Sequence, residues 1–213
     1  MRTLLFTLLY LSILFNSFSQ DTIRLKHKNY TTVFSKLKHY PVLVEWWVTK
    51  EKVNCKNPLT RTDKFVQDPL LPNETDLIQD YKGSGLDRGH MSPAADNLCL
   101  GVKVLNECFY FSNMAPQYHS LNAGDWKSLE TMVRENSKNN NDSIHVWSGN
   151  IGEIKKIGKV SVPKYCWKVI YSIKNKKFSA FLFENNSSKP NGITDNEVSI
   201  NEITKMTGFK FNN

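Results

Sequence analysis

The chain has 213 residues, 40% of them hydrophobic and 12% aromatic, which is the composition of a folded globular protein and excludes a disordered one. This length suits one compact domain or two very small ones. The formal net charge of +8 suits a polyanionic partner, either nucleic acid or an acidic membrane surface, although a basic soluble protein without such a partner can have the same charge.

Residues 1–20 differ in character from the rest of the chain. Arg2 supplies a positive charge, an apolar run extends from Leu4 to Phe15, and a more polar segment with small residues follows. This is the pattern of a secretory signal peptide, because a membrane-spanning helix needs about 20 apolar residues. We therefore expect a signal peptide over 1–20 and a soluble, secreted or periplasmic protein that consists of a single domain over 21–213.

The four cysteines fit an oxidising compartment, where an even number of them favours two disulfides with three possible pairings. Cys99 and Cys108 are close in sequence, so we expect them to pair and to leave Cys55 with Cys166. A zinc site is the rival interpretation, but it is not favoured because no Cys-x-x-Cys spacing occurs.

The first segment after residue 20 is polar and basic as far as His39, and it predicts an irregular lead-in. Residues 41–49 are rich in β-branched and aromatic side chains and predict a strand. Successive strand residues point to opposite faces, so Trp46 and Trp47 would lie on different sides of the sheet, with at least one of them in the core.

Further elements follow along the chain without repeats or an obvious linker. In order they are a strand over 106–112 that ends at Asn113, a helix over 121–135, a strand over 144–149, a hairpin of 165–173 with 177–183, and a short helix within 197–211. This mixture predicts one domain of the α+β class.

The helix over 121–135 has the clearest signals. Asn122 stands where an N-cap would lie, and Asp125 falls in the first turn. Trp126, Leu129, Met132 and Val133 recur at helical spacing, so they predict an apolar stripe that packs on a sheet.

The segment Asp87-Arg88-Gly89-His90 places a carboxylate, a guanidinium and an imidazole within four residues. We interpret it as the end of a strand running into a tight turn. His90 could act there as a general base and Arg88 as a fixed positive charge. Asn122 and Glu130 are eight residues apart, a little over two helical turns, so both can lean toward the same side. Each residue alone also has an ordinary structural explanation: a turn histidine, an N-cap and a solvated carboxylate.

Three motifs in order carry a resemblance to a known family. Asp-Arg-Gly-His at 87–90, Asn-Met-Ala-Pro-Gln at 113–117 and Leu-Asn-Ala-Gly-Asp-Trp at 121–126, followed by Glu130, resemble the DNA/RNA non-specific endonucleases of the ββα-metal group. The resemblance runs from about Arg61 through the helix and more weakly beyond it. It implies a mixed, mainly antiparallel central sheet with flanking helices.

The resemblance also implies roles for individual residues. His90 would be the general base, Asn122 the one protein ligand of a Mg²⁺ ion, and Glu130 would orient water at that ion. Arg88 would support the phosphate or the metal site. Arg61 would neutralise charge in the transition state, and Asn113 would help to position the histidine and its strand.

The resemblance implies a Mg²⁺-dependent endonuclease, in which Mn²⁺ can replace Mg²⁺, that cleaves DNA and RNA to 5′-phosphate ends. Its basic surface would bind both nucleic acids through the phosphate backbone with little sequence preference. The main alternative is a non-catalytic extracellular nucleic-acid-binding protein on the same scaffold, and an exported structural protein is a third interpretation. For Asp87 and Asp96 we expect structural roles.

Overall fold

The structure is a computed structural model and describes residues 21–212. The expected signal peptide over 1–20 therefore lies outside the described residues. None of the helices in the described part of the chain is long and apolar enough to cross a membrane.

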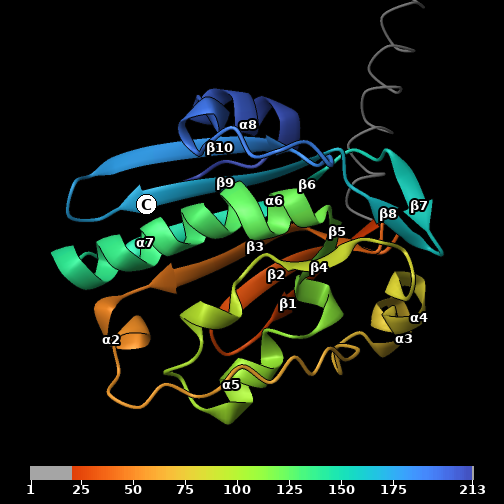
Figure 1. Cartoon of the computed structure of the whole chain (residues 1–213), viewed down its shortest axis with the longest axis horizontal. Helices are drawn as coiled ribbons and strands as arrows, with labels where there is room; N and C mark the ends of the chain where they lie inside the picture. Colours follow the sequence, from red (N-terminus) through yellow and green to blue (C-terminus); the bar gives the residue numbers. More distant parts are fainter. Residues whose placement is uncertain (1–20, 213) are drawn as a thin grey trace, which may run out of the picture.

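One seven-stranded antiparallel sheet forms the centre of the molecule (Figure 1). Its strands, in spatial order, are β1 (Thr22–Lys26), β2 (Tyr30–Ser35), β3 (Tyr40–Val48), β6 (Ile144–Ile151), β9 (Tyr165–Ser172), β10 (Lys177–Glu184) and β11 (Glu197–Val198). Two short ribbons accompany it, β4 (Asp87–His90) with β5 (Met114–Gln117) and β7 (Lys155–Ile157) with β8 (Val160–Val162). The predicted α+β class with a mainly antiparallel sheet is confirmed.

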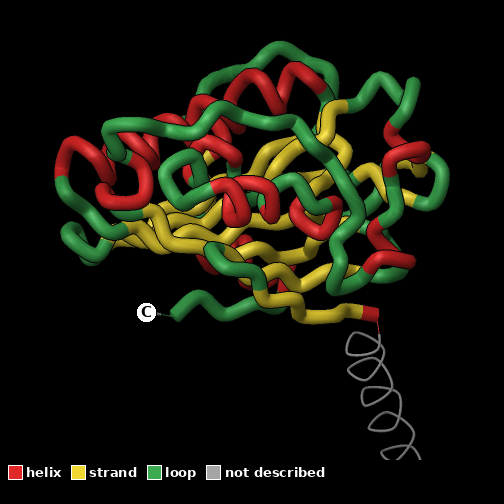
Figure 2. Tube along the Cα trace, turned by 90° about the horizontal axis from the view of Figure 1, so that it is seen from below, coloured by secondary structure: helices red, strands yellow, loops and turns green. Residues whose placement is uncertain are grey.

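The helices lie on both faces of this sheet. They are α2 (Lys50–Val53), α3 (Pro72–Thr75), α4 (Ile78–Tyr81), α5 (Val102–Glu107), α6 (His119–Leu121), α7 (Lys127–Asn140) and α8 (Ile200–Thr207). Helix α7 runs along one face and α8 along the other (Figure 1). Figure 2 shows the strands as one layer, with most of the helices and loops on the α7 side.

Two apolar layers hold the sheet between its helices. Trp126, Leu129 and Val133 of the α7 region pack on the inner face of the sheet, against Val146 and Phe183 among others. On the opposite face, Ile203 of α8 and Phe211 of the C-terminal segment pack on side chains that include Trp147 and Trp167. Met132, the fourth residue of the predicted apolar stripe, is largely exposed instead.

The tryptophan pair in β3 behaves as strand alternation predicts. Trp46 is buried on the α7 face, whereas Trp47 is on the other face and partly exposed, stacked on His145 at 4.2 Å between ring centroids. The strand over 144–149 and the hairpin of 165–173 with 177–183 are also present, as β6 and as β9 with β10.

The prediction of an irregular lead-in over 21–39 is wrong, because this segment forms β1 and β2. Strand β1 lies at the edge of the sheet and leaves most of its side chains outside the core, with Arg24 and Lys26 exposed. Charged residues are common on edge strands because they discourage pairing with other chains. Such residues hide the strand from a hydrophobicity pattern.

The prediction of a strand over 106–112 is also wrong. This region contains the end of α5 and a 3₁₀ turn at Phe111–Asn113, and the strand begins only at Met114. Cys108, Phe109 and Phe111 are all completely buried, but in small clusters beneath loops rather than in a sheet. A short apolar run indicates burial without indicating which backbone conformation achieves it.

The expected disulfide pairing is wrong as well. Cys55 is bonded to Cys99, and Cys108 and Cys166 are free and buried. The two free cysteines lie in separate apolar clusters, Cys108 just after α5 and Cys166 near the start of β9. Burial raises the pKa of both thiols. Proximity in sequence therefore did not predict the pairing.

Candidate active site

The ribbon of β4 and β5 carries the Asp-Arg-Gly-His motif, and His90 is the last residue of β4. Gly89 is required here because a Cβ atom would collide with the side chain of Gln117 on β5. This close approach lets the two strands pack tightly, with both residues buried. The motif thus forms a strand that ends at His90, the candidate general base, as the sequence predicts.

The helical segment that follows β5 is irregular at Asn122, the candidate metal ligand. Asn122–Trp126 forms a π-helical turn between α6 and α7, with Gly124 in a non-helical conformation. Asn122 is therefore inside the helical segment rather than at its N-cap, contrary to the prediction. Single π turns inside helices are frequent at functional sites, where they redirect side chains. With β4 and β5, this helix completes a ββα arrangement.

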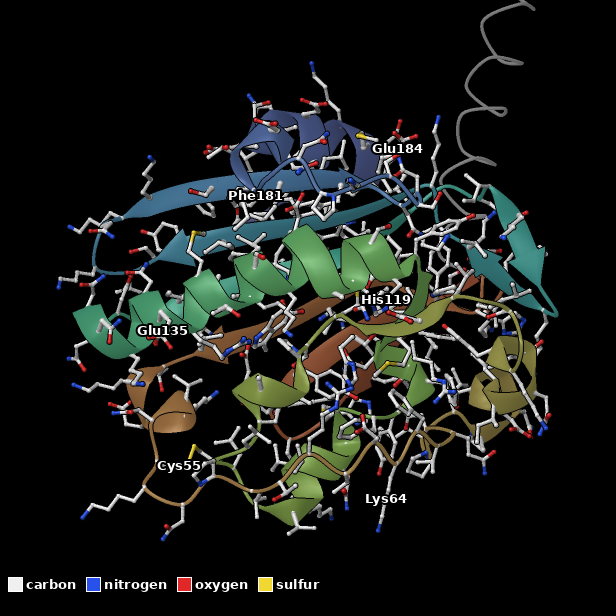
Figure 3. The ribbon with its side chains drawn as sticks, viewed as in Figure 1. Cys55, Lys64, His119, Glu135, Phe181 and Glu184 are labelled. Carbon is white, nitrogen blue, oxygen red and sulfur yellow. A yellow bond between two sulfur atoms is a disulfide. The ribbon has the colours of Figure 1, made fainter. Side chains whose placement is uncertain are left out.

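Asn122 is oriented by Asp87, whose Oδ2 atom accepts a hydrogen bond of 2.8 Å from Asn122 Nδ2. The same oxygen lies 2.8 Å from Nδ1 of His119, a largely exposed residue of α6 (Figure 3). An ionised carboxylate only accepts hydrogen bonds, so the amide nitrogen of Asn122 must face Asp87. The amide oxygen accepts no hydrogen bond from the described residues and is available to a ligand.

A cavity of about 260 Å³ opens between β4, α7 and the loops beside them. Five of the six residues expected in the site line it: Arg61, Arg88, His90, Asn122 and Glu130. Asn122 and Glu130 reach it from the same helical segment, so the expectation that they share a side is correct despite the π turn. A second cavity beside it is also lined by Arg61, Arg88 and Asn122.

Asn113 is the expected residue that does not line this cavity. It is completely buried, and its side chain bonds the backbone N–H and carbonyl of Ser92 and the carbonyl of Cys108. Its own carbonyl accepts a hydrogen bond from the N–H of Met91. Asn113 thus braces the chain immediately after His90, while it stays away from any substrate.

His90 is held in an apolar frame, with the rings of Phe65 and Phe109 at 5.6 and 5.1 Å between centroids. Its backbone carbonyl accepts a 3.1 Å hydrogen bond from Trp126 Nε1. Its ring nitrogen Nε2 is buried and has no hydrogen-bond partner in the described structure. Burial, and secondarily the positive charge of Arg61, lowers the pKa of His90 to about 3. The imidazole is consequently neutral and able to accept a proton at physiological pH.

The two arginines lie over the same aromatic frame. The guanidinium carbon of Arg88 is 4.6 Å from the centre of the Phe65 ring, and that of Arg61 is 5.5 Å from the centre of the Phe109 ring. Arg61 also donates a 2.6 Å hydrogen bond to Asp63. Cation–π contacts of this kind fix a guanidinium without removing its charge from the cavity. The site therefore presents two positive charges beside a neutral base.

Glu130 lines the cavity and contacts a charged residue that the sequence analysis did not identify. Its Oε1 atom is 3.6 Å from Nζ of the buried Lys168, which belongs to β9. Arg134 also lines the cavity and donates a 3.1 Å hydrogen bond to the buried Asp96. Arg134 follows Glu130 by four residues, a spacing that places both on one helix face and could have been recognised. For Lys168, the only signal in the sequence is that a lysine stands within a predicted strand of mostly apolar residues.

The oxygen of Asn122 is the neutral ligand that this cavity offers to a metal ion. Within residues 21–212, no three His, Cys, Asp or Glu side chains are grouped as a metal site. An ion that needs several nitrogen or sulfur ligands does not fit this arrangement. Mg²⁺ does fit, because it keeps most of its water and binds through one or two protein oxygens.

Comparison with known proteins agrees with the fold. The family model for DNA/RNA non-specific endonucleases matches residues 12–213, and the chain belongs to this family. The human mitochondrial nuclease EXOG is 29% identical over 208 residues, covering 87% of this chain and 55% of that protein. The nuclease of Serratia marcescens is 32% identical over 166 residues, covering 70% of this chain and 61% of that protein.

The chain thus spans little more than half the length of the human relative. A crystal structure of the EndoG/EndoGI complex, which concerns the mechanism of EndoG inhibition, superimposes with a TM-score of 0.78. Its sequence is 26% identical, and the match covers 88% of this chain and 84% of that one.

Proposed function

We propose that this protein is a Mg²⁺-dependent, sugar-non-specific endonuclease that hydrolyses phosphodiester bonds in DNA and RNA and leaves 5′-phosphate ends. One observation carries the proposal: His90, Asn122 and Glu130 line a single cavity together with Arg61 and Arg88. Membership of the non-specific endonuclease family supports it.

In the proposed mechanism His90 is the general base. Its neutral imidazole accepts a proton from a water molecule, whose oxygen forms a bond to phosphorus as the bond to the 3′ oxygen breaks. The departing 3′ oxygen then takes a proton from solvent. The low pKa of His90 ensures that the base is unprotonated, and the aromatic frame of Phe65 and Phe109 holds its ring in one orientation.

Charge neutralisation is the second requirement, because the phosphodiester is an anion and gains charge in the transition state. Arg88 and Arg61 supply fixed positive charges at the cavity. Asn122 would hold Mg²⁺, or Mn²⁺ in its place, which supplies Lewis-acid stabilisation of the charge on the phosphate and the leaving oxygen. The Glu130 carboxylate would orient water beside it.

The decisive experiment incubates the purified protein with plasmid DNA and with RNA, in the presence of Mg²⁺ or of EDTA. We expect cleavage of both substrates with Mg²⁺, none with EDTA, and none by His90→Ala, which should still bind nucleic acid. Activity that survives His90→Ala would disprove the proposed mechanism. Salt-sensitive binding without turnover by the wild-type protein would instead establish the alternative, a non-catalytic nucleic-acid-binding protein.

We also infer that the protein is exported and that residues 21–213 form one domain. The Cys55–Cys99 disulfide supports export, because disulfides persist in oxidising compartments. The human relative is named as mitochondrial, so the two locations need to be distinguished. N-terminal sequencing of protein recovered from the periplasm or medium should give a start near residue 21, and limited proteolysis should give no stable smaller fragment.

A further inference from the structure

Lys168 is a buried lysine at the centre of the sheet. It lies in the middle of β9, opposite Ser148 of β6 and Phe181 of β10, and its side chain is 1% exposed. Its neighbours in β9 are almost all apolar or aromatic. Removing an ammonium group from water costs several kcal/mol. The whole free energy of unfolding of a small domain is of the same order of magnitude. Such a residue needs an explanation beyond packing.

The ammonium group of Lys168 is directed at the underside of the candidate active site. Its Nζ atom lies 4.0 Å from the centre of the Trp126 ring and 3.6 Å from Glu130 Oε1. The 3.6 Å separation is that of an ion pair rather than a short hydrogen bond, and Nζ has no hydrogen-bond partner among the described residues. Glu130 is therefore contacted by Lys168 from within the core while it lines the cavity.

A second buried ion pair lies beside this one. Asp96 is almost completely buried and accepts hydrogen bonds from Arg134 at 3.1 Å and from the Trp46 indole at 2.8 Å. The cluster thus contains two cations and two carboxylates and is close to electrically neutral. Neutrality explains how the charges are tolerated, but not why they are there. Buried ion pairs are often no more stable than apolar side chains of the same volume.

The position of Glu130 suggests the reason. Its carboxylate would have to keep one orientation beside Asn122 in order to align water for the attack on phosphorus. Mobile water in the cavity fixes a carboxylate less well than a buried charge, and Lys168 Nζ is itself in contact with two indole rings, at 4.0 Å from the centre of Trp126 and 5.8 Å from that of Trp46. Trp126 also bonds the backbone carbonyl of His90, so the same ring contacts Lys168 and holds the strand of the base.

We propose that Lys168 is a positioning residue for the reaction, which holds the Glu130 carboxylate aimed into the cavity from inside the core. This inference depends on the proposed endonuclease function. It assigns no contact with substrate to Lys168, which acts only through Glu130. Burial raises the pKa of Glu130, and the Lys168 charge opposes that rise. The geometry and the electrostatics therefore agree.

The test is a double-mutant cycle between the two residues, with cleavage of plasmid DNA as the assay. Lys168→Met keeps the length of the side chain and removes its charge, and Glu130→Gln removes the carboxylate. We expect Lys168→Met to lower kcat on the order of 10²-fold, the effect of a misplaced catalytic group, with little change in KM. In the Glu130→Gln background the same substitution should have little further effect. Lys177→Met, at an exposed lysine of β10, is the matched control.

The pH dependence of kcat provides a readout that a purely structural role would not change. Without the ammonium group the pKa of Glu130 should rise, so the acid limb of kcat should move to higher pH. The other charged or titratable groups around this pair are Arg134 on α7, Asp96, Lys52 on α2 and Cys166 on β9. All of them remain in both single variants, so a shift seen in Lys168→Met and absent from the double variant belongs to Glu130.

Lys168→Arg keeps the charge and guards against a folding failure of Lys168→Met. The bulkier guanidinium should displace Glu130 and reduce kcat while leaving the acid limb near its wild-type pH. Circular dichroism of each variant verifies the fold. Additive losses in the double-mutant cycle, or wild-type kcat in either Lys168 variant, would overturn the inference. A wild-type protein that cleaves neither DNA nor RNA would instead refute the proposed function.

Discussion

Asp87 and Asn122 are joined by a 2.8 Å hydrogen bond that crosses from strand β4 to the π turn before α7. The bond leaves the Asn122 amide with only one possible orientation, in which the oxygen is free for a ligand. Asp87, for which the sequence predicts a structural role, thus orients the one neutral side-chain oxygen among the described residues that line the cavity. Residues that orient a metal ligand can be as important as the ligand itself.

Asp87→Ala should therefore weaken Mg²⁺ binding. Loss of an orienting partner typically costs about 10–100-fold in metal affinity, and the Mg²⁺ concentration for half-maximal cleavage should rise within this range. Initial rates over a Mg²⁺ titration measure it. His119→Ala is the control, because it removes the other contact of the same carboxylate and leaves the Asn122 contact intact. An equal effect of both substitutions would contradict the prediction.

Gly89→Ala should destabilise the β4–β5 ribbon, because the added Cβ collides with Gln117. Overpacking of this kind costs about 1–3 kcal/mol, and each kcal/mol lowers Tm by about 2–4 °C in a domain of this size. Truncating Gln117 removes the atoms that the new Cβ would meet, and the Cβ then fills part of the space that they leave. Differential scanning calorimetry should show that Gln117→Ala restores most of the stability of Gly89→Ala.

His90 should make the folded protein sensitive to acid. Burial lowers its pKa from the ordinary 6.5 to about 3, so between these values only the unfolded chain is protonated at this residue. The contribution of His90 to the free energy of unfolding therefore rises as the pH increases from about 3 to 6.5, and it is lost as the pH falls through the same range. His90→Gln does not titrate, and urea unfolding from pH 7 to pH 4 should show a smaller loss for it. Parallel profiles would contradict the assigned pKa direction.

The pH dependence of cleavage should also reflect the low pKa of His90. A histidine base with an ordinary pKa would lose activity through pH 6.5, whereas this base should remain neutral and keep its function at lower pH. The acid limb of kcat should then belong to Glu130, whose pKa is raised by burial. In Glu130→Gln, the acid limb of the residual activity should therefore move to lower pH. An acid limb near pH 6.5 in both proteins would assign an ordinary pKa to His90.

The Cys55–Cys99 disulfide should be the only link in a non-reducing peptide map of the described region. Its loop includes the segment with Arg61 and the β4 strand with His90. Reduction, or the double change Cys55→Ser with Cys99→Ser, should cost about 2–5 kcal/mol of stability. A peptide joined through Cys108 or Cys166 would contradict the structure. Both free thiols should resist alkylation until the protein unfolds.

Parts of the fold were predictable because the relevant patterns are local. Strand β3 and the hairpin of β9 with β10 are rich in β-branched and aromatic residues, and α7 shows helical periodicity. Strands β1 and β2 were missed although their apolar and polar residues alternate as in a half-buried strand, because the basic residues of β1 and of the flanking turns dominate the composition of 21–39. The apolar run around Phe109 was misassigned because burial beneath loops and burial in a sheet produce the same composition.

The sequence by itself determined the family and the chemical inventory of the site, since the three motifs list the base, the amide oxygen, the carboxylate and an arginine. Only the tertiary structure decided which groups meet. The Cys55–Cys99 pair, the bond from Asp87 to Asn122 and the contact of Lys168 with Glu130 join residues 44, 35 and 38 positions apart. Such contacts arise from strand pairing and helix packing, whereas a sequence pattern reports only neighbours along the chain.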